Sequence, residues 1–177
     1  MKPSASLFIL CALTLLALRL PSETFSAERN MPPGKYLLTD VVFEVTDNGG
    51  LAGGSSTVRV SGTGRGVLVV RNPALPEQIS EFAVDPKDVL RLLSVCYQNR
   101  FFDLEPSYGP PDSPRLTANG EVEVFSTIVA DAGGRTITLQ IGSYSKTVSY
   151  LVGFYPPPIL IEVSEAIEAM RSKPVGK

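Results

Sequence analysis

Residues 85–99 read DPKDVLRLLSVCYQN, and this stretch decides the class of fold. Asp85 is a favoured N-cap residue, and Pro86 suits the first helical position, where its missing N–H would have no partner in any case. Apolar residues then recur at helical spacing up to Asn99, which predicts one buried stripe. The stripe consists of Val89, Leu92, Leu93, Cys96 and Tyr97. The stretch is therefore an amphipathic helix that needs another layer to pack against.

Runs rich in β-branched residues lie on both sides of this helix and predict strands. They occupy residues 37–46, 57–61, 67–71, 121–130, 135–141 and 144–152. Residues 62–66 are a glycine-rich hairpin turn, and residues 72–84 are expected to be a connector with at most a short extended piece. Residues 131–134 form the expected turn between the strand at 121–130 and the strand at 135–141.

A second helix is expected after the proline tract at 156–158, with an apolar stripe of Leu160, Val163, Ile167 and Met170. The predicted fold is α+β, because runs of strands are interrupted by only two helices. We expect a largely antiparallel sheet of about five or six strands with both helices on one face. The expected order is β-β-β-α-β-β-β-α. The other sheet face is expected to be polar, with Thr136, Thr138 and Gln140 on it.

Residues 1–26 have the pattern of a signal peptide, with a positive start, an apolar run at 7–18 and a polar stretch before Ala27. The apolar run is too short to span a bilayer, which takes roughly 20 residues. We expect cleavage near Ala27, export to the periplasm or the cell exterior, and no membrane span after cleavage. The alternative is a helix of the folded domain or an uncleaved anchor. The predicted organisation is a signal peptide at 1–26, a flexible segment at 27–36, one α+β domain at 37–172 and a flexible tail at 173–177.

The composition excludes several classes of function. The chain has 177 residues, of which 44% are hydrophobic and 19% charged, as is typical of a globular protein. Lys and Arg number 16 against 18 Asp and Glu, so no basic excess favours nucleic acid or anionic lipid. There is no histidine, which removes the commonest general base and most zinc sites. We expect no nucleic-acid partner, metal or cofactor, and a buried, unreactive thiol at Cys96.

Residues 105–118 are the longest segment with no strand or helix pattern, and they are rich in proline. Proline fixes φ and so lowers the entropy lost on docking, while Tyr108 offers a large contact area with few rotatable bonds. Asp112 and Arg115 add charge that can orient a partner. Because binding residues concentrate on loops held by a scaffold, this loop is the candidate interaction surface. The alternative is a passive insertion.

Glu121 and Glu123 are the best pair of carboxylates in the chain. They lie two apart on a predicted strand, so they share one face. Two close carboxylates can share a proton or bind Ca²⁺, but the same pattern is typical of a solvated sheet face that resists edge pairing. The solvated face is the favoured interpretation. Across the next turn, Asp131 and Arg135 are expected to form an exposed ion pair.

The order of features also resembles a known pattern. It is carried by VDP at 84–86 through FFDL at 101–104, then Tyr108 and Asp112, KTVSY at 146–150, and two prolines at 157–158. In these features the chain resembles an uncharacterised family of secreted bacterial domains, a domain of unknown function, over residues 57–171. This chain lacks the paired cysteines that many such proteins carry in the first hairpin. The resemblance implies a similar fold and brings no established activity.

The sequence thus favours an exported, non-catalytic binding or structural interaction module. Its partner would be an unknown protein or a small-molecule ligand. The alternative is an exported hydrolase that uses the carboxylates of Glu121 and Glu123.

Overall fold

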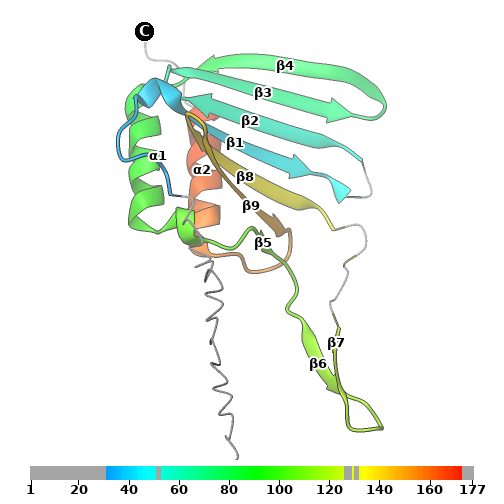
Figure 1. The fold of residues 1–177 in the computed structure, drawn as a ribbon. Helices are drawn as coiled ribbons and strands as arrows, with labels where there is room; N and C mark the ends of the chain where they lie inside the picture. Colours follow the sequence, from blue (N-terminus) through cyan, green and yellow to red (C-terminus); the bar gives the residue numbers. More distant parts are fainter. Residues whose placement is uncertain (1–30, 51–52, 126–128, 130–131, 173–177) are drawn as a thin grey trace, which may run out of the picture.

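The computed structural model describes residues 31–50, 53–125, 129 and 132–172 (Figure 1). Within these residues, two α-helices lie together on one face of a twisted sheet. The α+β class predicted from the sequence is confirmed. The predicted signal peptide and the predicted tail lie outside the described residues, so they stay predictions.

Seven strands form the main sheet, in the order β4-β3-β2-β1-β8-β9-β5. Their bounds are β1 (Val41–Asn48), β2 (Ser55–Ser61), β3 (Arg65–Asn72), β4 (Leu75–Ala83), β5 (Ser107–Tyr108), β8 (Gly134–Ile141) and β9 (Tyr144–Leu151). Every neighbouring pair is antiparallel except β5 and β9, which run parallel. The sheet is therefore mixed, and it is larger than the five or six strands expected.

The core lies between this sheet and the helices α1 (Pro86–Gln98) and α2 (Pro158–Ser172). Alternate residues of each central strand point toward the helices, because side chains in a strand alternate between its two faces. Phe43 of β1 pairs with Leu139 of β8, and both side chains are fully buried. Each such side chain contributes roughly 1.5–3 kcal/mol by leaving water.

Helix α1 begins and ends close to the predicted residues. The Asp85 carboxylate accepts a hydrogen bond of 2.8 Å from the backbone N–H of Lys87, which caps the helix as expected. Four members of the predicted stripe are buried. Tyr97 is the exception: it is 44% exposed at the border of the stripe, and its ring packs on Phe102 with centroids 4.8 Å apart.

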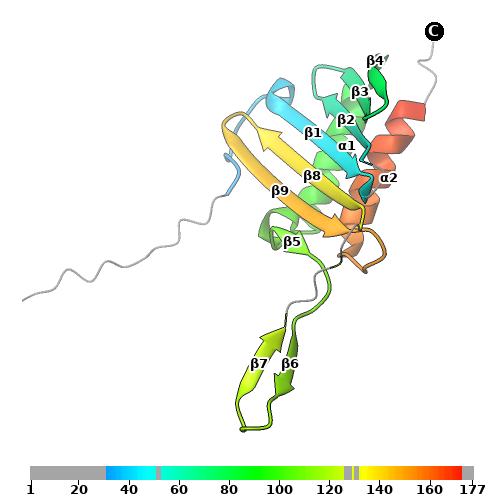
Figure 2. The same ribbon diagram turned by 90° about the vertical axis from the view of Figure 1, so that its right-hand side faces the viewer.

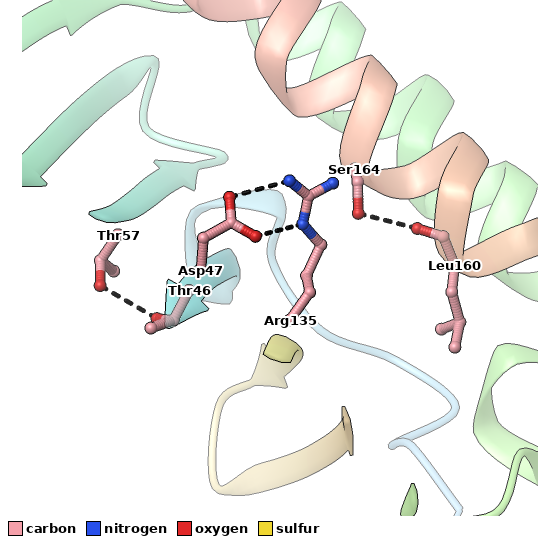
Figure 3. A network of polar contacts seen from close by, with 6 residues as sticks. All are labelled: Thr46, Asp47, Thr57, Arg135, Leu160 and Ser164. Atoms are coloured by element: carbon pink, nitrogen blue, oxygen red, sulfur yellow. Dashed lines mark hydrogen bonds and ion pairs between the residues drawn. The ribbon is translucent and has the colours of Figure 1, made fainter. Parts of the chain in front are cut away.

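Helix α2 buries all four residues of its predicted stripe. It also buries Ser164, whose hydroxyl donates a hydrogen bond of 2.8 Å to the carbonyl of Leu160 (Figure 3). This bond inside the helix satisfies a polar group that would otherwise be costly to bury. None of the described helices is both long and apolar enough to cross a membrane.

The sheet face opposite the helices is polar along β8 and β9, as predicted for β8, whereas nearer the β4 edge it carries Val42, Val67, Val69 and Ile79. Three pairs of hydroxyls on neighbouring strands are hydrogen-bonded to each other at 3.0 Å: Thr46 with Thr57, Thr136 with Ser149, and Thr138 with Thr147. Cross-strand hydroxyl pairs of this kind stabilise a sheet by roughly 0.2–1 kcal/mol each.

Two predictions about strands are wrong. Residues 75–83, expected to be mostly connector, form the edge strand β4 because Asn72 and Leu75 close a tight turn. The strand predicted at 121–130 was expected to pair with 135–141. Instead β7 (Val122–Phe125) pairs with β6 (Ser113–Leu116) in a separate two-stranded sheet. Strand β8 takes β1 and β9 as its neighbours.

Candidate functional site

The candidate loop at 105–118 is more regular than its prolines suggested. Strand β5 adds to the edge of the main sheet, and the backbone N–H of Ser149 donates to the carbonyl of Pro106 at 2.9 Å. Strand β6 then leaves the body and forms an antiparallel hairpin with β7. Residues 113–125 are called the arm below. Figure 2 shows the arm standing clear of both the sheet and the helices.

The tip of the arm is held by a dense set of local hydrogen bonds. The backbone N–H of Thr117 donates to the carbonyl of Glu121 at 2.8 Å, and the Asn119 amide donates to the Glu121 carboxylate at 2.7 Å. Gly120 has a φ of 86°, in the left-handed region that a short hairpin turn ending in glycine requires. The turn therefore fixes the register of the two strands.

This register divides the arm into two unlike faces. Directly opposite residues share a face, as do residues two apart on one strand. Pro114 lies opposite Val124, and Leu116 lies opposite Val122, so these four side chains form what we call the apolar face of the arm. Leu116, Val122 and Val124 are 70%, 66% and 64% exposed.

The other face of the arm carries its charge. Arg115 lies directly opposite Glu123, and Ser113 lies opposite Phe125. All four residues are exposed. The opposite charges of Arg115 and Glu123 compensate each other on the side of the ribbon away from the apolar face.

The structure brings most of the predicted site residues to the arm. Arg115 and Glu123 lie on it, Glu121 lies in its turn, and Asp112 directly precedes β6. Tyr108 lies apart from them, in β5 at the root of the arm. Its hydroxyl accepts a hydrogen bond of 3.1 Å from the backbone N–H of Glu105, and its ring packs against the core. Tyr108 thus helps to hold the segment from which the arm leaves.

Glu121 and Glu123 were predicted to lie side by side on one face of a strand of the main sheet, and this prediction is wrong. Glu121 lies in the turn, hydrogen-bonded to Asn119, while Glu123 faces Arg115. No group of three or more Asp, Glu, His or Cys side chains that could hold a metal ion occurs among the described residues.

A hollow of about 360 Å³ lies at the root of the arm. Side chains of Asn48, Thr136 and Ser149 contribute to its lining, together with Tyr108, whereas Glu121 and Glu123 do not. The lining also includes Arg135, Tyr150 and Leu151, so it combines apolar surface with amide, hydroxyl and guanidinium groups that can form hydrogen bonds.

Arg135, which also lines this hollow, forms an ion pair with Asp47. Its guanidinium binds the carboxylate of Asp47 through two nitrogen atoms, with Nε at 2.5 Å and Nη2 at 2.8 Å (Figure 3). The hydrogen bonds that Arg135 donates to the Asp47 carboxylate raise the pKa of Arg135, so the guanidinium stays charged. The predicted partner, Asp131, lies outside the described residues. The pair joins the ends of β1 and β8 beside the point where the arm leaves.

Two further features of the body, the Cys96 thiol and the contact between Tyr36 and Tyr97, have structural roles. Burial raises the pKa of the Cys96 thiol to about 12, which keeps it protonated and unreactive, as expected. The hydroxyls of Tyr36 and Tyr97 lie 2.9 Å apart, and partial burial with this contact raises the pKa of Tyr36. The contact ties the N-terminal segment to α1.

No family model matches the chain. No curated protein matches it either. The resemblance to a family of secreted bacterial domains therefore stays a prediction, and function has to be inferred from the shape and chemistry of the arm.

The sequence contained one signal for the arm that the prediction did not use. Asn119 and Gly120 form a hairpin-turn dipeptide, with an apolar residue on each side at Leu116 and Val122. This signal locates a hairpin across 113–125. It does not reveal that the hairpin stands apart from the main sheet.

Proposed function

We propose that the protein is an exported, non-catalytic binding module and that the apolar face of the arm is its contact surface. One observation carries the proposal: a two-stranded ribbon exposes Pro114, Leu116, Val122 and Val124 together on one side. Isolated two-stranded hairpins are marginally stable in water, and a hydrophobic face needs a covering layer to contribute stability. A partner that covers this face would supply that layer.

The stiffness of the arm supports the same function. The tip is closed by hydrogen bonds among Thr117, Asn119 and Glu121. Pro110, Pro111 and Pro114 fix φ along the segment that leads into the hairpin. A surface ordered before binding loses less conformational entropy when it docks, so more of the contact energy becomes affinity.

The placement of the carboxylates supports binding over hydrolysis. Acid catalysis by paired carboxylates needs both groups beside the bond that breaks. Glu121 and Glu123 are exposed on a thin ribbon, each beside a local partner of its own. Export remains part of the proposal on the strength of the signal-peptide pattern at 1–26.

The proposal is tested by placing a photo-crosslinking amino acid at Val124 in the apolar face and, as a matched control, at Glu123 in the opposite face. Both sites are exposed and adjacent on β7, so they differ only in the side of the ribbon. We expect a discrete adduct from position 124 in cells that export the protein, and little or none from position 123. Equal adducts from the two positions, or none from either, would refute the arm as the contact surface.

A further inference from the structure

The chemistry of the apolar face also indicates which partner covers it, and this inference rests on the proposed function. We infer that a second copy of this chain covers the apolar face, so that two arms stack face to face. The inference follows from the chemistry of the patch, the position of the arm and the area it offers.

The patch is self-complementary. A two-fold contact brings the same surface together from both copies, so residue i of one copy meets residue j of the other and j meets i, and a charge at the axis meets its own kind. The apolar face contains one proline, one leucine and two valines and no charged or hydrogen-bonding side chain. The charged residues Arg115 and Glu123 lie on the other side of the ribbon and have opposite signs. Two stacked arms therefore suffer no like-charge contact between their inner faces.

The apolar face also lacks the charged and polar groups by which a different protein could recognise it specifically. Specific recognition between unlike proteins usually relies on complementary charge and on polar groups that penalise the wrong partner. An uncharged aliphatic patch matches another such patch, and an identical one is carried by every copy of the chain.

The position of the arm allows this contact. It stands clear of the body in Figure 2, so two arms can overlap while the two bodies stay apart. Stacked sheets pack about 10 Å apart, and two ribbons at that distance make a four-stranded, two-layered unit. Each ribbon then gains the covered hydrophobic face that an isolated hairpin lacks.

The area predicts the strength of the contact. With Leu116, Val122 and Val124 exposed at 64–70% and Pro114 also exposed, the apolar face can bury on the order of 300–400 Å² per copy. A stable interface buries about 800 Å² per partner. Because the area of the apolar face is about half of that in a stable interface, stacked arms should form a weak dimer that dissociates on dilution.

The test uses the purified protein alone, with its mass measured by sedimentation equilibrium at concentrations up to about 1 mM. We expect a reversible shift from monomer to dimer. Val124→Asp should abolish the shift, because it places a carboxylate in the contact. The matched control is Ser113→Asp, which adds the same charge to the opposite face of the arm and should leave the dimer unchanged.

Mixing two variants shows whether a variant is monomeric because the contact between arms is lost or because its arm is unfolded. Val124→Asp and Val124→Lys should each be monomeric, and mixing them should restore association because opposite charges then share the interface. A wild-type protein that stays monomeric at about 1 mM would overturn the inference. So would equal effects of Val124→Asp and Ser113→Asp, or no recovery in the mixture. If the purified protein is monomeric but position 124 crosslinks to a different protein, the second copy is refuted and the binding function stands.

Discussion

Replacing Gly62 by alanine should test how tightly the start of β1 is fixed. Gly62 is buried beside the 3-10 turn η1 (Leu38–Asp40), and its N–H donates to the carbonyl of Val41 at 2.9 Å. A Cβ atom at this position would lie 1.8 Å from the carbonyl oxygen of Leu38 and 2.6 Å from its carbonyl carbon. Ordinary carbon contacts are about 3.5–4.0 Å, so the backbone of the turn would have to move by more than about 1 Å.

The neighbouring bonds oppose that movement. The contact is to backbone atoms, so no side chain can rotate away, and β1 is paired with β2 and β8 on its two sides. Overpacking of this kind costs about 1–3 kcal/mol, and we expect Gly62→Ala to lie at the upper end. For a domain of this size, about 3 kcal/mol lowers Tm by roughly 6–12 °C.

The assay is thermal and urea unfolding of Gly62→Ala beside a control, Gly34→Ala. Gly34 is exposed and has no atom within 4 Å of its would-be Cβ, so its substitution should change stability by no more than about 0.5 kcal/mol. Equal stability of the two variants would show that η1 does not lie against Gly62 as described.

Three further predictions concern the body. Leu93→Ala should cost about 2–5 kcal/mol in urea unfolding, because Leu93 is buried in α1; a cost near zero would place that face of the helix in solvent. Burial raises the pKa of Cys96 from 9.0 to about 12, so the thiol contributes full stability below pH 9 and loses it as the pH rises toward 12. Unfolding free energies should therefore fall relative to Cys96→Ala over that range, by up to about 1.4 kcal/mol per pH unit, and parallel curves would contradict the burial. A double-mutant cycle of Asp47→Asn and Arg135→Leu should give a coupling of about 1–2 kcal/mol, since the pair is two-pronged and only partly exposed; additive effects would mean that the two side chains do not interact.

The helices could be predicted from the sequence because their signals are local. Asp85 and Pro86 mark a helix start within two residues, and the stripe from Val89 to Cys96 repeats at each of about two successive turns. The same holds for the hairpin β8–β9, where alternation and a short turn lie next to each other in the chain.

The arm and its neighbours could not be placed from such signals. Val122 and Val124 alternate with Glu121 and Glu123 whether the apolar side faces the core of the same chain or faces solvent. The ion pair of Arg135 with Asp47 joins residues 88 apart in sequence, so the sequence pointed only to the nearer Asp131, which lies outside the described residues. Strand β5 has only two residues, which is too short for any periodic pattern.

The ladder between β1 and β8 has a consequence for how the chain folds. It joins the beginning of the described chain to its last third, with Val41 opposite Ile141. Pairings so distant in sequence raise the contact order, and loop-closure entropy must be overcome before they form, which slows folding. During synthesis, the edge of β1 that pairs with β8 would stay open until residues 134–141 have emerged. Until then the growing chain has an open strand edge, and this is the form that chaperones and proteases meet.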